Sequence, residues 1–191
     1  MELLKEKIKS CGEVMPGNVL RVDSFLNHQI DTELVNQCGL EWYKLFKDEK
    51  ITKILTIESS GIGIACLTAQ HFGVPVVYAK KTRVSSHSNA FYSTKVVSYT
   101  HGQSYEVLIS KKFISPNDRI LLIDDFLAHG SALKVLINLA EMGGAKIVGA
   151  GIVIEKAYLN GGKNLRELGY RIESLARIES MSVEGGIVFA E

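Results

Sequence analysis

The chain has 191 residues, of which 46% are hydrophobic and 23% are charged, a composition that can bury one hydrophobic core and that predicts a single domain over residues 1–191. Its 22 basic and 21 acidic residues leave a formal net charge of +1, which excludes a broad electrostatic attraction to nucleic acid or to an anionic membrane. No apolar run approaches the roughly 20 residues that span a bilayer, and the N-terminus has no signal-peptide core. We therefore expect a cytoplasmic protein without a nucleic-acid or membrane partner.

The three cysteines, Cys11, Cys38 and Cys66, are far apart, and their spacing fits neither a zinc site nor a disulfide pair. Each falls on the apolar stripe of an expected helix, where a free thiol packs as a small hydrophobic side chain. The five histidines show no metal-binding spacing. We expect three inert, buried thiols and no dedicated metal site.

Two helices separated by an irregular stretch are expected in the first 50 residues. Leu4, Ile8 and Cys11 recur at helical spacing before Gly12 ends the pattern. Asp31 is placed to cap a longer helix with an apolar face over residues 34–46. The stretch between them, PGNVLRVDSFLNHQ, fits neither period, and such a long loop is a candidate for function.

From residue 53 onward, short apolar strands alternate with amphipathic helices. Residues 54–57 predict a strand that ends in Glu58-Ser59-Ser60-Gly61, and a helix follows with Ile62, Ala65, Cys66 and Ala69 on one face. Residues 74–79 and 105–109 predict further strands. A strand, helix, strand unit implies a parallel sheet with a right-handed crossover. Residues 80–103 are polar and hydroxyl-rich, and residues 94–99 are candidates for an exposed hairpin arm.

The segment from Arg119 to Met142 is the most informative. Residues 120–123 are apolar on both faces, as in a central parallel strand, and the run ends in Asp124-Asp125. A helix is expected after the loop 126–130, with Gly143-Gly144 as its C-cap. A buried strand over 146–154, a short helix near 164–168 and strands near 170–176 and 186–189 complete a doubly wound α/β fold, whose ligand should lie at the carboxyl ends of the strands.

The acid pair, the glycine-containing loop and the helix start form an arrangement that suits a sugar phosphate. Free amides of the first helical turn and the positive end of the helix dipole favour a phosphate dianion. Gly130 allows a close backbone approach, and Ser131 adds a hydroxyl donor. Asp124 and Asp125 can accept hydrogen bonds from sugar hydroxyls or help to place Mg²⁺. Together they describe a site for ribose 5-phosphate.

Taken singly, each of these features has an ordinary explanation. Two aspartates after a strand are often only an exposed turn, and a cluster such as Lys80-Lys81-Thr82-Arg83 is more often a solvated face. Lys156 alone is as well explained as a surface lysine. The third glycine of a dinucleotide fingerprint and the P-loop motif are both missing from the sequence. The functional interpretation therefore depends on the combination of strand, acids, loop and helix.

The stretch ILLIDDFLAHGSA resembles the motif that binds phosphoribosyl pyrophosphate (PRPP) in the type I phosphoribosyltransferases, in which two acids at a strand end precede the 5-phosphate loop. Ala128 and Ala132 stand where that motif commonly has threonine or serine, so phosphate would depend more on backbone amides. The resemblance implies a Rossmann-like α/β fold with a central parallel sheet flanked by helices. It also implies a core over about residues 50–155 and a small hood over about 1–49 and 156–191.

The resemblance also implies roles for particular residues. The turn 58–63 would bind pyrophosphate through backbone amides, often with a cis peptide, and a mobile arm over residues 80–103 would close over the substrates, with Arg83 as a further pyrophosphate contact. The implied catalytic residues are Asp124, Asp125 and Lys81. The implied PRPP- or phosphate-binding residues are Ala128, His129, Gly130, Ser131, Ala132, Ser59, Ser60, Gly61 and Lys80.

With GNVLRVDSFLNHQID and Glu155-Lys156 included, the whole chain is similar to the xanthine-specific members of this family, in which Leu20, Asn27 and Lys156 line the base pocket. This similarity implies transfer of the phosphoribosyl group of PRPP to xanthine in purine salvage, Mg²⁺ bound with PRPP or pyrophosphate, and a homodimer. One alternative is a hypoxanthine/guanine or adenine phosphoribosyltransferase, which would share the PRPP half of the site. Another is a non-catalytic PRPP-sensing purine regulator, for which a DNA-binding domain or a strongly basic face is expected.

Overall fold

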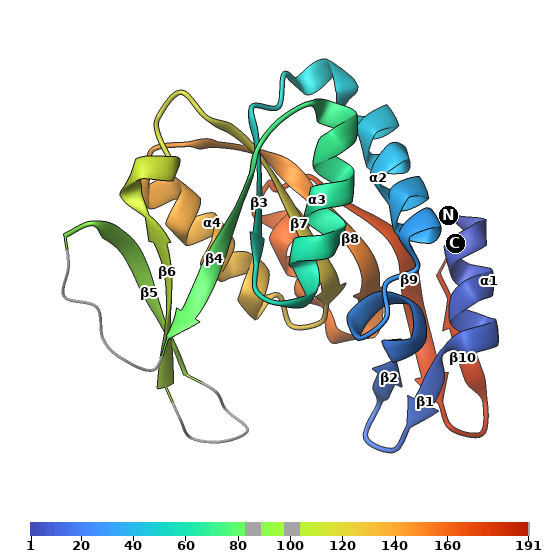
Figure 1. Cartoon of the computed structure of the whole chain (residues 1–191). Helices are drawn as coiled ribbons and strands as arrows, with labels where there is room; N and C mark the ends of the chain where they lie inside the picture. Colours follow the sequence, from blue (N-terminus) through green and yellow to red (C-terminus); the bar gives the residue numbers. More distant parts are fainter. Residues whose placement is uncertain (83–88, 98–103, 191) are drawn as a thin grey trace.

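Helices and strands alternate along most of the chain in the computed structural model, which describes residues 1–82, 89–97 and 104–190 (Figure 1). In chain order they are α1 (Glu2–Cys11), β1 (Glu13–Met15), β2 (Val19–Arg21), the π-helical turn η1 (Asp23–Asn27), α2 (Thr32–Phe46), η2 (Lys47–Glu49), β3 (Lys53–Ile57), α3 (Ser60–Phe72), β4 (Val76–Thr82), β5 (Phe91–Val97), β6 (Ser104–Ser110), η3 (Lys111–Phe113), β7 (Arg119–Leu127), α4 (Ser131–Met142), β8 (Lys146–Lys156), η4 (Ala157–Leu159), α5 (Gly161–Glu167), β9 (Ile172–Ser182) and β10 (Gly186–Phe189).

The main sheet of the described residues has the strand order β10-β9-β8-β7-β3-β4-β6-β5. Its centre, from β9 to β4, is parallel, and β10 at one edge and β6 and β5 at the other are antiparallel. The expected central parallel sheet flanked by helices is confirmed. Because parallel strands end at the same edge, the carboxyl ends of β3, β7 and β8 lie next to one another.

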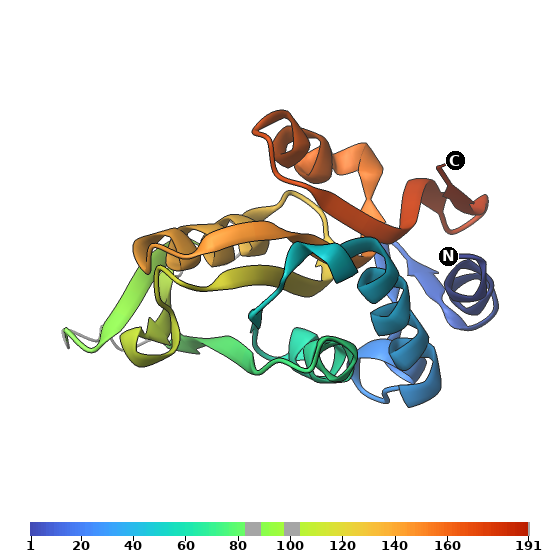
Figure 2. The ribbon, with the colours of Figure 1, turned by 90° about the horizontal axis from the view of Figure 1, so that it is seen from above.

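Helices cover both faces of the sheet (Figure 2). The side chains of Ile54 and Leu121 pack in one core with α2 and α3, whereas Leu55 and Leu122 pack in a second core with α4. This alternation explains why β3 and β7 are apolar on both faces. The two cores fix the ends of β3 and β7 relative to the helices that follow them.

The helix boundaries that the sequence predicted are confirmed at two positions. The Asp31 carboxylate accepts a hydrogen bond from the Leu34 amide at 3.2 Å and caps α2. Gly130, with a φ of 81°, stands directly before α4. At the other end of α4, the Gly143 amide donates to the Ala140 carbonyl.

Three expectations about local structure were wrong. Cys38 is buried, and burial raises the pKa of its thiol to about 12, but Cys11 and Cys66 are exposed. On α3 the buried face includes Ile64 and Thr68 in place of Ile62 and Cys66, because a narrow apolar stripe does not fix the rotation of a short helix. The stretch expected to be irregular, residues 16–29, contains β2, which pairs with β1 in an antiparallel hairpin, and the turn η1.

The N-terminal segment packs against the end of the chain. The Met1 amino group donates a hydrogen bond to the Leu175 carbonyl at 2.7 Å, and α1 lies beside the β9–β10 hairpin (Figure 2). These contacts bring the two parts of the expected hood together, and the proposed boundaries near residues 49 and 156 stay a prediction. Among the described helices, none is long and apolar enough to cross a bilayer.

Candidate active site

Two neighbouring acids stand at the carboxyl end of β7. Asp124 is only 4% exposed, and its carboxylate accepts a hydrogen bond from the Asp125 amide at 3.0 Å. The Asp125 carboxylate accepts one from the Phe126 amide at 2.9 Å. Burial, and secondly the negative charge of Asp125, raise the pKa of Asp124 well above its usual value, while the positive charge of Lys81 opposes that rise. A buried acid with such a shifted pKa is a candidate for function.

The turn after β3 packs beside this acid pair. The peptide bond between Glu58 and Ser59 is cis, as the resemblance implied. A methyl group placed on Gly61 would overlap the hydroxyl of Thr56 and would lie 3.4 Å from an oxygen of Asp124. Gly61 therefore lets the backbone of the turn approach the first acid closely. The structure brings the predicted pyrophosphate turn, residues 58–63, to the acid pair.

The predicted phosphate loop leads directly from the acid pair into α4. Among the described residues, no side chain forms a hydrogen bond that caps the start of α4, so the first-turn amides are oriented to meet an anion. His129 and Ser131 are exposed, whereas Ala128 and Ala132 are half-buried. The loop presents mainly backbone donors, as its two alanines suggest.

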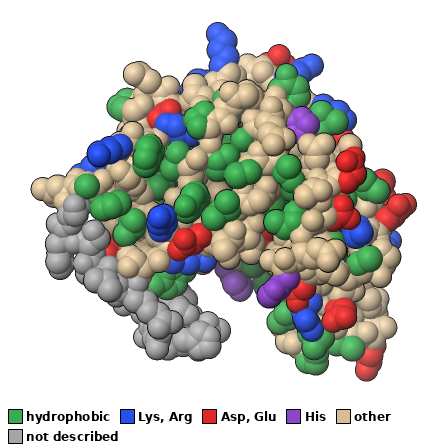
Figure 3. Space-filling view, viewed as in Figure 1, with side chains coloured by type: hydrophobic (Ala, Val, Ile, Leu, Met, Phe, Trp, Pro, Cys, Tyr) green, Lys and Arg blue, Asp and Glu red, His purple; other side chains and the backbone are tan. Residues whose placement is uncertain are grey.

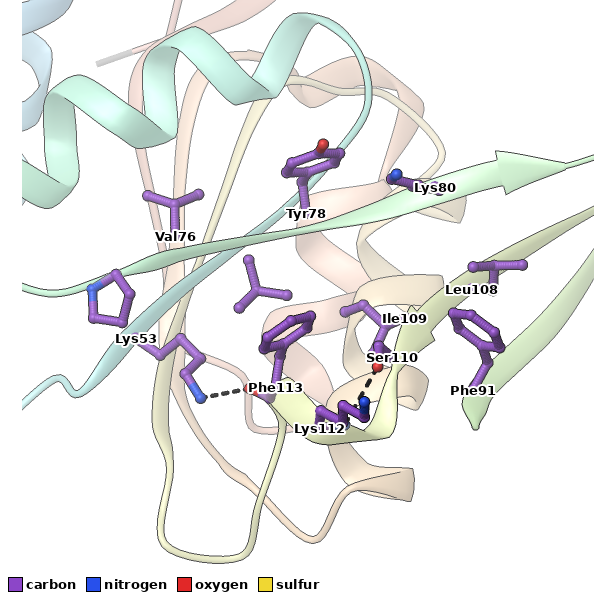
Figure 4. A pocket seen from close by; sticks show the side chains of 12 residues that line it. Lys53, Val76, Tyr78, Lys80, Phe91, Leu108, Ile109, Ser110, Lys112 and Phe113 are labelled. Atoms are coloured by element: carbon purple, nitrogen blue, oxygen red, sulfur yellow. Dashed lines mark hydrogen bonds between the residues drawn. The ribbon is translucent and has the colours of Figure 1, made fainter. Parts of the chain in front are cut away.

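The neighbouring lysines on β4 point to opposite faces of the sheet. Lys81 lies within electrostatic reach of Asp124, and its amide donates to the Glu58 carboxylate. The ammonium group of Lys80 instead lies 5.7 Å from the centroid of the Tyr78 ring (Figure 4). The structure thus brings Lys81 to the acid pair and does not bring Lys80 there. Arg83 lies outside the described residues.

Lys80 lines a cavity of about 600 Å³ on a part of the sheet that α3 leaves uncovered (Figure 4). Hydrophobic side chains gather on this part of the surface (Figure 3). Lys53, which also lines the cavity, forms an ion pair with Asp118 at 2.9 Å. The cavity contains neither the acid pair nor the phosphate loop, so we place the chemistry at the carboxyl ends of the strands.

The candidate base pocket lies where β8 ends. Lys156 donates a hydrogen bond to the Asn18 carbonyl at 2.9 Å, and its ammonium group lies 5.7 Å from the centroid of the Phe126 ring. Burial lowers the pKa of Lys156. The N-terminal loop that carries Leu20 and Asn27 is thereby held at the end of β8. The side-chain oxygen of Asn27 is buried and has no hydrogen-bond partner among the described residues, so it is free to bind a polar ligand.

Two residues near this pocket were not singled out from the sequence. Phe126 follows the acid pair directly and contributes an aromatic ring beside Lys156. Its position at the end of the strand that carries the acids could have identified Phe126 from the sequence. The Tyr158 hydroxyl is buried without a hydrogen-bond partner in the part of the chain that the structure describes, and burial raises its pKa. No sequence pattern marked Tyr158, because its environment depends on the N-terminal segment packed around it.

A family model described as the phosphoribosyl transferase domain matches residues 28–171. The chain belongs to the phosphoribosyltransferase family. Among relatives, the xanthine phosphoribosyltransferase of Lachnoclostridium phytofermentans is 55% identical over 188 residues, which cover 98% of this chain and 97% of that protein. The xanthine phosphoribosyltransferase of Bifidobacterium adolescentis is 51% identical over 189 residues, covering 98% of each.

Solved structures agree with this phosphoribosyltransferase in fold. The adenine phosphoribosyltransferase of Thermoanaerobacter pseudethanolicus superposes with a TM-score of 0.74 at 23% identity, over 91% of this chain and 99% of that one. At this identity the likeness shows the fold alone. The type I phosphoribosyltransferase fold expected from the sequence is confirmed.

Proposed function

We propose that this phosphoribosyltransferase joins xanthine to the ribose 5-phosphate of PRPP, giving xanthosine 5′-monophosphate and pyrophosphate in purine salvage. The single observation that carries the proposal is that three groups lie together at the carboxyl ends of β7 and β8: the acid pair, the phosphate loop, and Lys156 beside Phe126. These three groups match a ribose, its 5-phosphate and a base. The names of the two bacterial relatives favour xanthine as that base.

The chemistry needs no protein nucleophile. The bond from the anomeric carbon of PRPP to the pyrophosphate oxygen breaks while a bond to a purine nitrogen forms, and positive charge develops at that carbon. The residues of the chain hold the reacting atoms and stabilise the departing charge. We assign the ribose hydroxyls to Asp124 and Asp125, the 5-phosphate to the amides of residues 128–132, and the pyrophosphate to the turn 59–61 with Lys81.

Xanthine suits the polar groups of the base pocket. Its two carbonyl oxygens can accept hydrogen bonds from the Lys156 ammonium group and from the Asn27 amide nitrogen, and its ring N–H groups can donate to the Asn27 oxygen. The Phe126 ring offers an apolar face to a flat base, and Leu20, only 6% exposed, offers an apolar wall. Adenine has no carbonyl oxygen that could accept a hydrogen bond from the Lys156 ammonium group, which favours an oxopurine.

Mg²⁺ fits this site as part of the substrate. Within the described residues, no group of three or more His, Cys, Asp or Glu side chains is arranged to hold a metal. Mg²⁺ is commonly bound by one or two carboxylates together with substrate phosphates, and Asp124 and Asp125 can supply such ligands. When bound with PRPP, the ion neutralises charge on the departing pyrophosphate.

The test is a direct assay of the purified chain. It is incubated with Mg²⁺, PRPP and each of xanthine, hypoxanthine, guanine and adenine, and pyrophosphate release is measured. We expect kcat/KM for xanthine to exceed that for each other base, with no release when the base is omitted. A higher kcat/KM for another base would make that base the substrate. Absence of pyrophosphate release with every base would favour a PRPP-sensing regulator.

The same proposal includes a cytoplasmic location and a homodimer. A homodimer predicts a mass of about twice the chain's 21.0 kDa. Size-exclusion chromatography with light scattering would measure it, and a single-chain mass would remove the dimer from the proposal.

A further inference from the structure

The phosphate loop is supported from behind by α5. A methyl group placed on Gly161, the first residue of α5, would overlap the Ala128 carbonyl oxygen and would lie 2.7 Å from the Gly130 amide nitrogen. A methyl group on Gly130 would in turn lie 3.1 Å from the Leu165 side chain, which is only 1% exposed. Two glycines from distant parts of the chain therefore allow the backbone of α5 to contact the backbone of the loop.

A buried ion pair fixes α5 in this place. The Glu155 carboxylate is 1% exposed and accepts two hydrogen bonds from the Arg166 guanidinium, both at 2.8 Å. Arg166 also donates to the Ile172 carbonyl at the start of β9. A bidentate pair defines both distance and orientation, so Arg166 ties α5 to the end of β8 and to β9.

The charge balance of this pair supports a fixed arrangement. Burial, the largest single influence, would raise the pKa of Glu155, but the combined effect of Arg166, Ser174 and Arg177 outweighs burial and holds that pKa below its usual value. Arg177 lies opposite, with its Nε 3.5 Å from the same carboxylate. Gly162 leaves room for the pair, because a methyl group there would overlap Glu155. Removing Arg166 would leave a buried carboxylate without its main partner.

We propose that Gly161, Leu165 and the Glu155–Arg166 pair are positioning residues for the reaction: α5 sets the 5-phosphate loop, and the ion pair couples that loop to Lys156, the residue next to Glu155. The inference rests on the proposed function only in taking residues 128–132 as the phosphate loop and Lys156 as a base contact. None of these four residues is among the groups that we assign to the ribose, the phosphates or the base. They act through the loop backbone and through the end of β8.

The coupling predicts two different kinetic patterns. Gly161→Ala pushes the loop backbone alone, so KM for PRPP rises on the order of 10-fold or more, as small displacements of positioning groups do, while KM for xanthine changes little. Arg166→Met frees α5 and the end of β8 together, so the KM values of both substrates rise. Arg166→Lys restores the charge without the bidentate geometry and rescues part of the loss.

Gly149→Ala is the matched control. Gly149 is also buried, and a methyl group there would lie 2.9 Å from a backbone oxygen, that of Arg171, but it stands near the start of β8, away from the site. The substitution should lower the melting temperature as Gly161→Ala does and leave both KM values unchanged at 25 °C. If Gly161→Ala does not fold, Leu165→Ala tests the same support by removing the contact behind Gly130.

The decisive measurement is calorimetric binding of PRPP with Mg²⁺ in the absence of a purine. Wild-type binding with at least 10-fold weaker binding by Gly161→Ala, or by Leu165→Ala in its place, supports the inference. Equal binding by wild type and variant overturns it, as does equal weakening in Gly149→Ala. Wild-type protein that binds PRPP but does not use xanthine overturns only the proposed base, and wild-type protein that does not bind PRPP overturns both.

Discussion

The ammonium group of Lys156 lies 5.7 Å from the centroid of the Phe126 ring, one residue beyond the acid pair of β7. Lys156 and Phe126 come from neighbouring parallel strands, in which Phe126 is paired with Ile154. The pairing of β7 with β8 thus places a cation and an aromatic face beside the acids that we assign to the ribose. This juxtaposition is the basis for the first prediction.

Replacing Lys156 with alanine should weaken xanthine more than PRPP. The substitution removes the donor to the carbonyl oxygens of the base, and a hydrogen bond from a charged group contributes about 1.5–3 kcal/mol. We therefore expect kcat/KM for xanthine to fall roughly 10- to 150-fold, with the calorimetric Kd for PRPP unchanged. Lys163→Ala, an exposed lysine on α5, is the control. Equal losses for both substrates would mean that Lys156 supports structure.

Asp125→Asn should slow turnover without unfolding the protein. The amide oxygen of asparagine can still accept the hydrogen bond from the Phe126 amide, now 2.9 Å from Asp125, but the negative charge beside the ribose is lost. We expect a loss of about 2–4 kcal/mol of transition-state stabilisation, seen as a lower kcat with a near wild-type melting temperature. Asp48→Asn, at an exposed position in η2, should leave the rate unchanged. A normal rate in Asp125→Asn would remove Asp125 from the site.

Asp124→Asn should make the ligand-free protein more stable at neutral pH. Burial raises the pKa of Asp124 in the folded state, so the folded chain holds this proton more tightly than the unfolded chain. The resulting stability is fully present below the ordinary aspartate pKa and is lost as pH rises through the raised one. Asparagine does not ionise and avoids that loss.

The measurement is thermal unfolding of wild type and Asp124→Asn without ligands, between pH 4.5 and pH 8. The variant should have the higher melting temperature at pH 8, and the difference should shrink as pH falls. The same variant should lose catalytic activity, because the acid whose ionisation lowers stability is one that we assign to the ribose. A difference in melting temperature that does not change with pH would argue against the raised pKa.

The arrangement of the proposed PRPP half of the site could be predicted more directly from the sequence than that of the proposed base half. Asp124, Asp125 and Gly130 lie within one run of strand, loop and helix, and local periodicity and a helix start are enough to place such a run. The base pocket depends on contacts between distant segments, such as Lys156 with Asn18. No local pattern reports these contacts.

The differences between expectation and structure have the same physical origin. Lys80 and Lys81 are adjacent in sequence, but on a strand they point to opposite faces, and only the sheet shows which of them lies on the side of the acid pair. Cys11 and Cys66 were expected to be buried, because a helical stripe indicates a buried face and not its width. The contact between Gly161 and the phosphate loop involves segments about 30 residues apart in the chain, and neither segment alone indicates it.

Trp42, the single tryptophan of the chain, joins α2 to the sheet and offers a test of stability separate from the site. It is fully buried, and its indole nitrogen donates to the Glu173 carbonyl of β9 at 3.1 Å. Trp42→Phe removes this hydrogen bond and part of the buried ring, so we expect a loss of about 2–3 kcal/mol in the free energy of unfolding. Urea unfolding followed by circular dichroism would measure it.

Tyr43→Phe, the neighbouring substitution on α2, keeps the ring that packs against Phe72 at 5.2 Å and should cost little. Both variants should keep wild-type KM values at 25 °C, because Trp42 stabilises the sheet and lies away from the carboxyl ends of its strands.

In wild type, the fluorescence emission of the buried indole should shift to longer wavelength at the same urea concentration as the circular dichroism transition, since small domains commonly unfold in one cooperative step. A loss of activity in Trp42→Phe without a loss of stability would contradict this assignment.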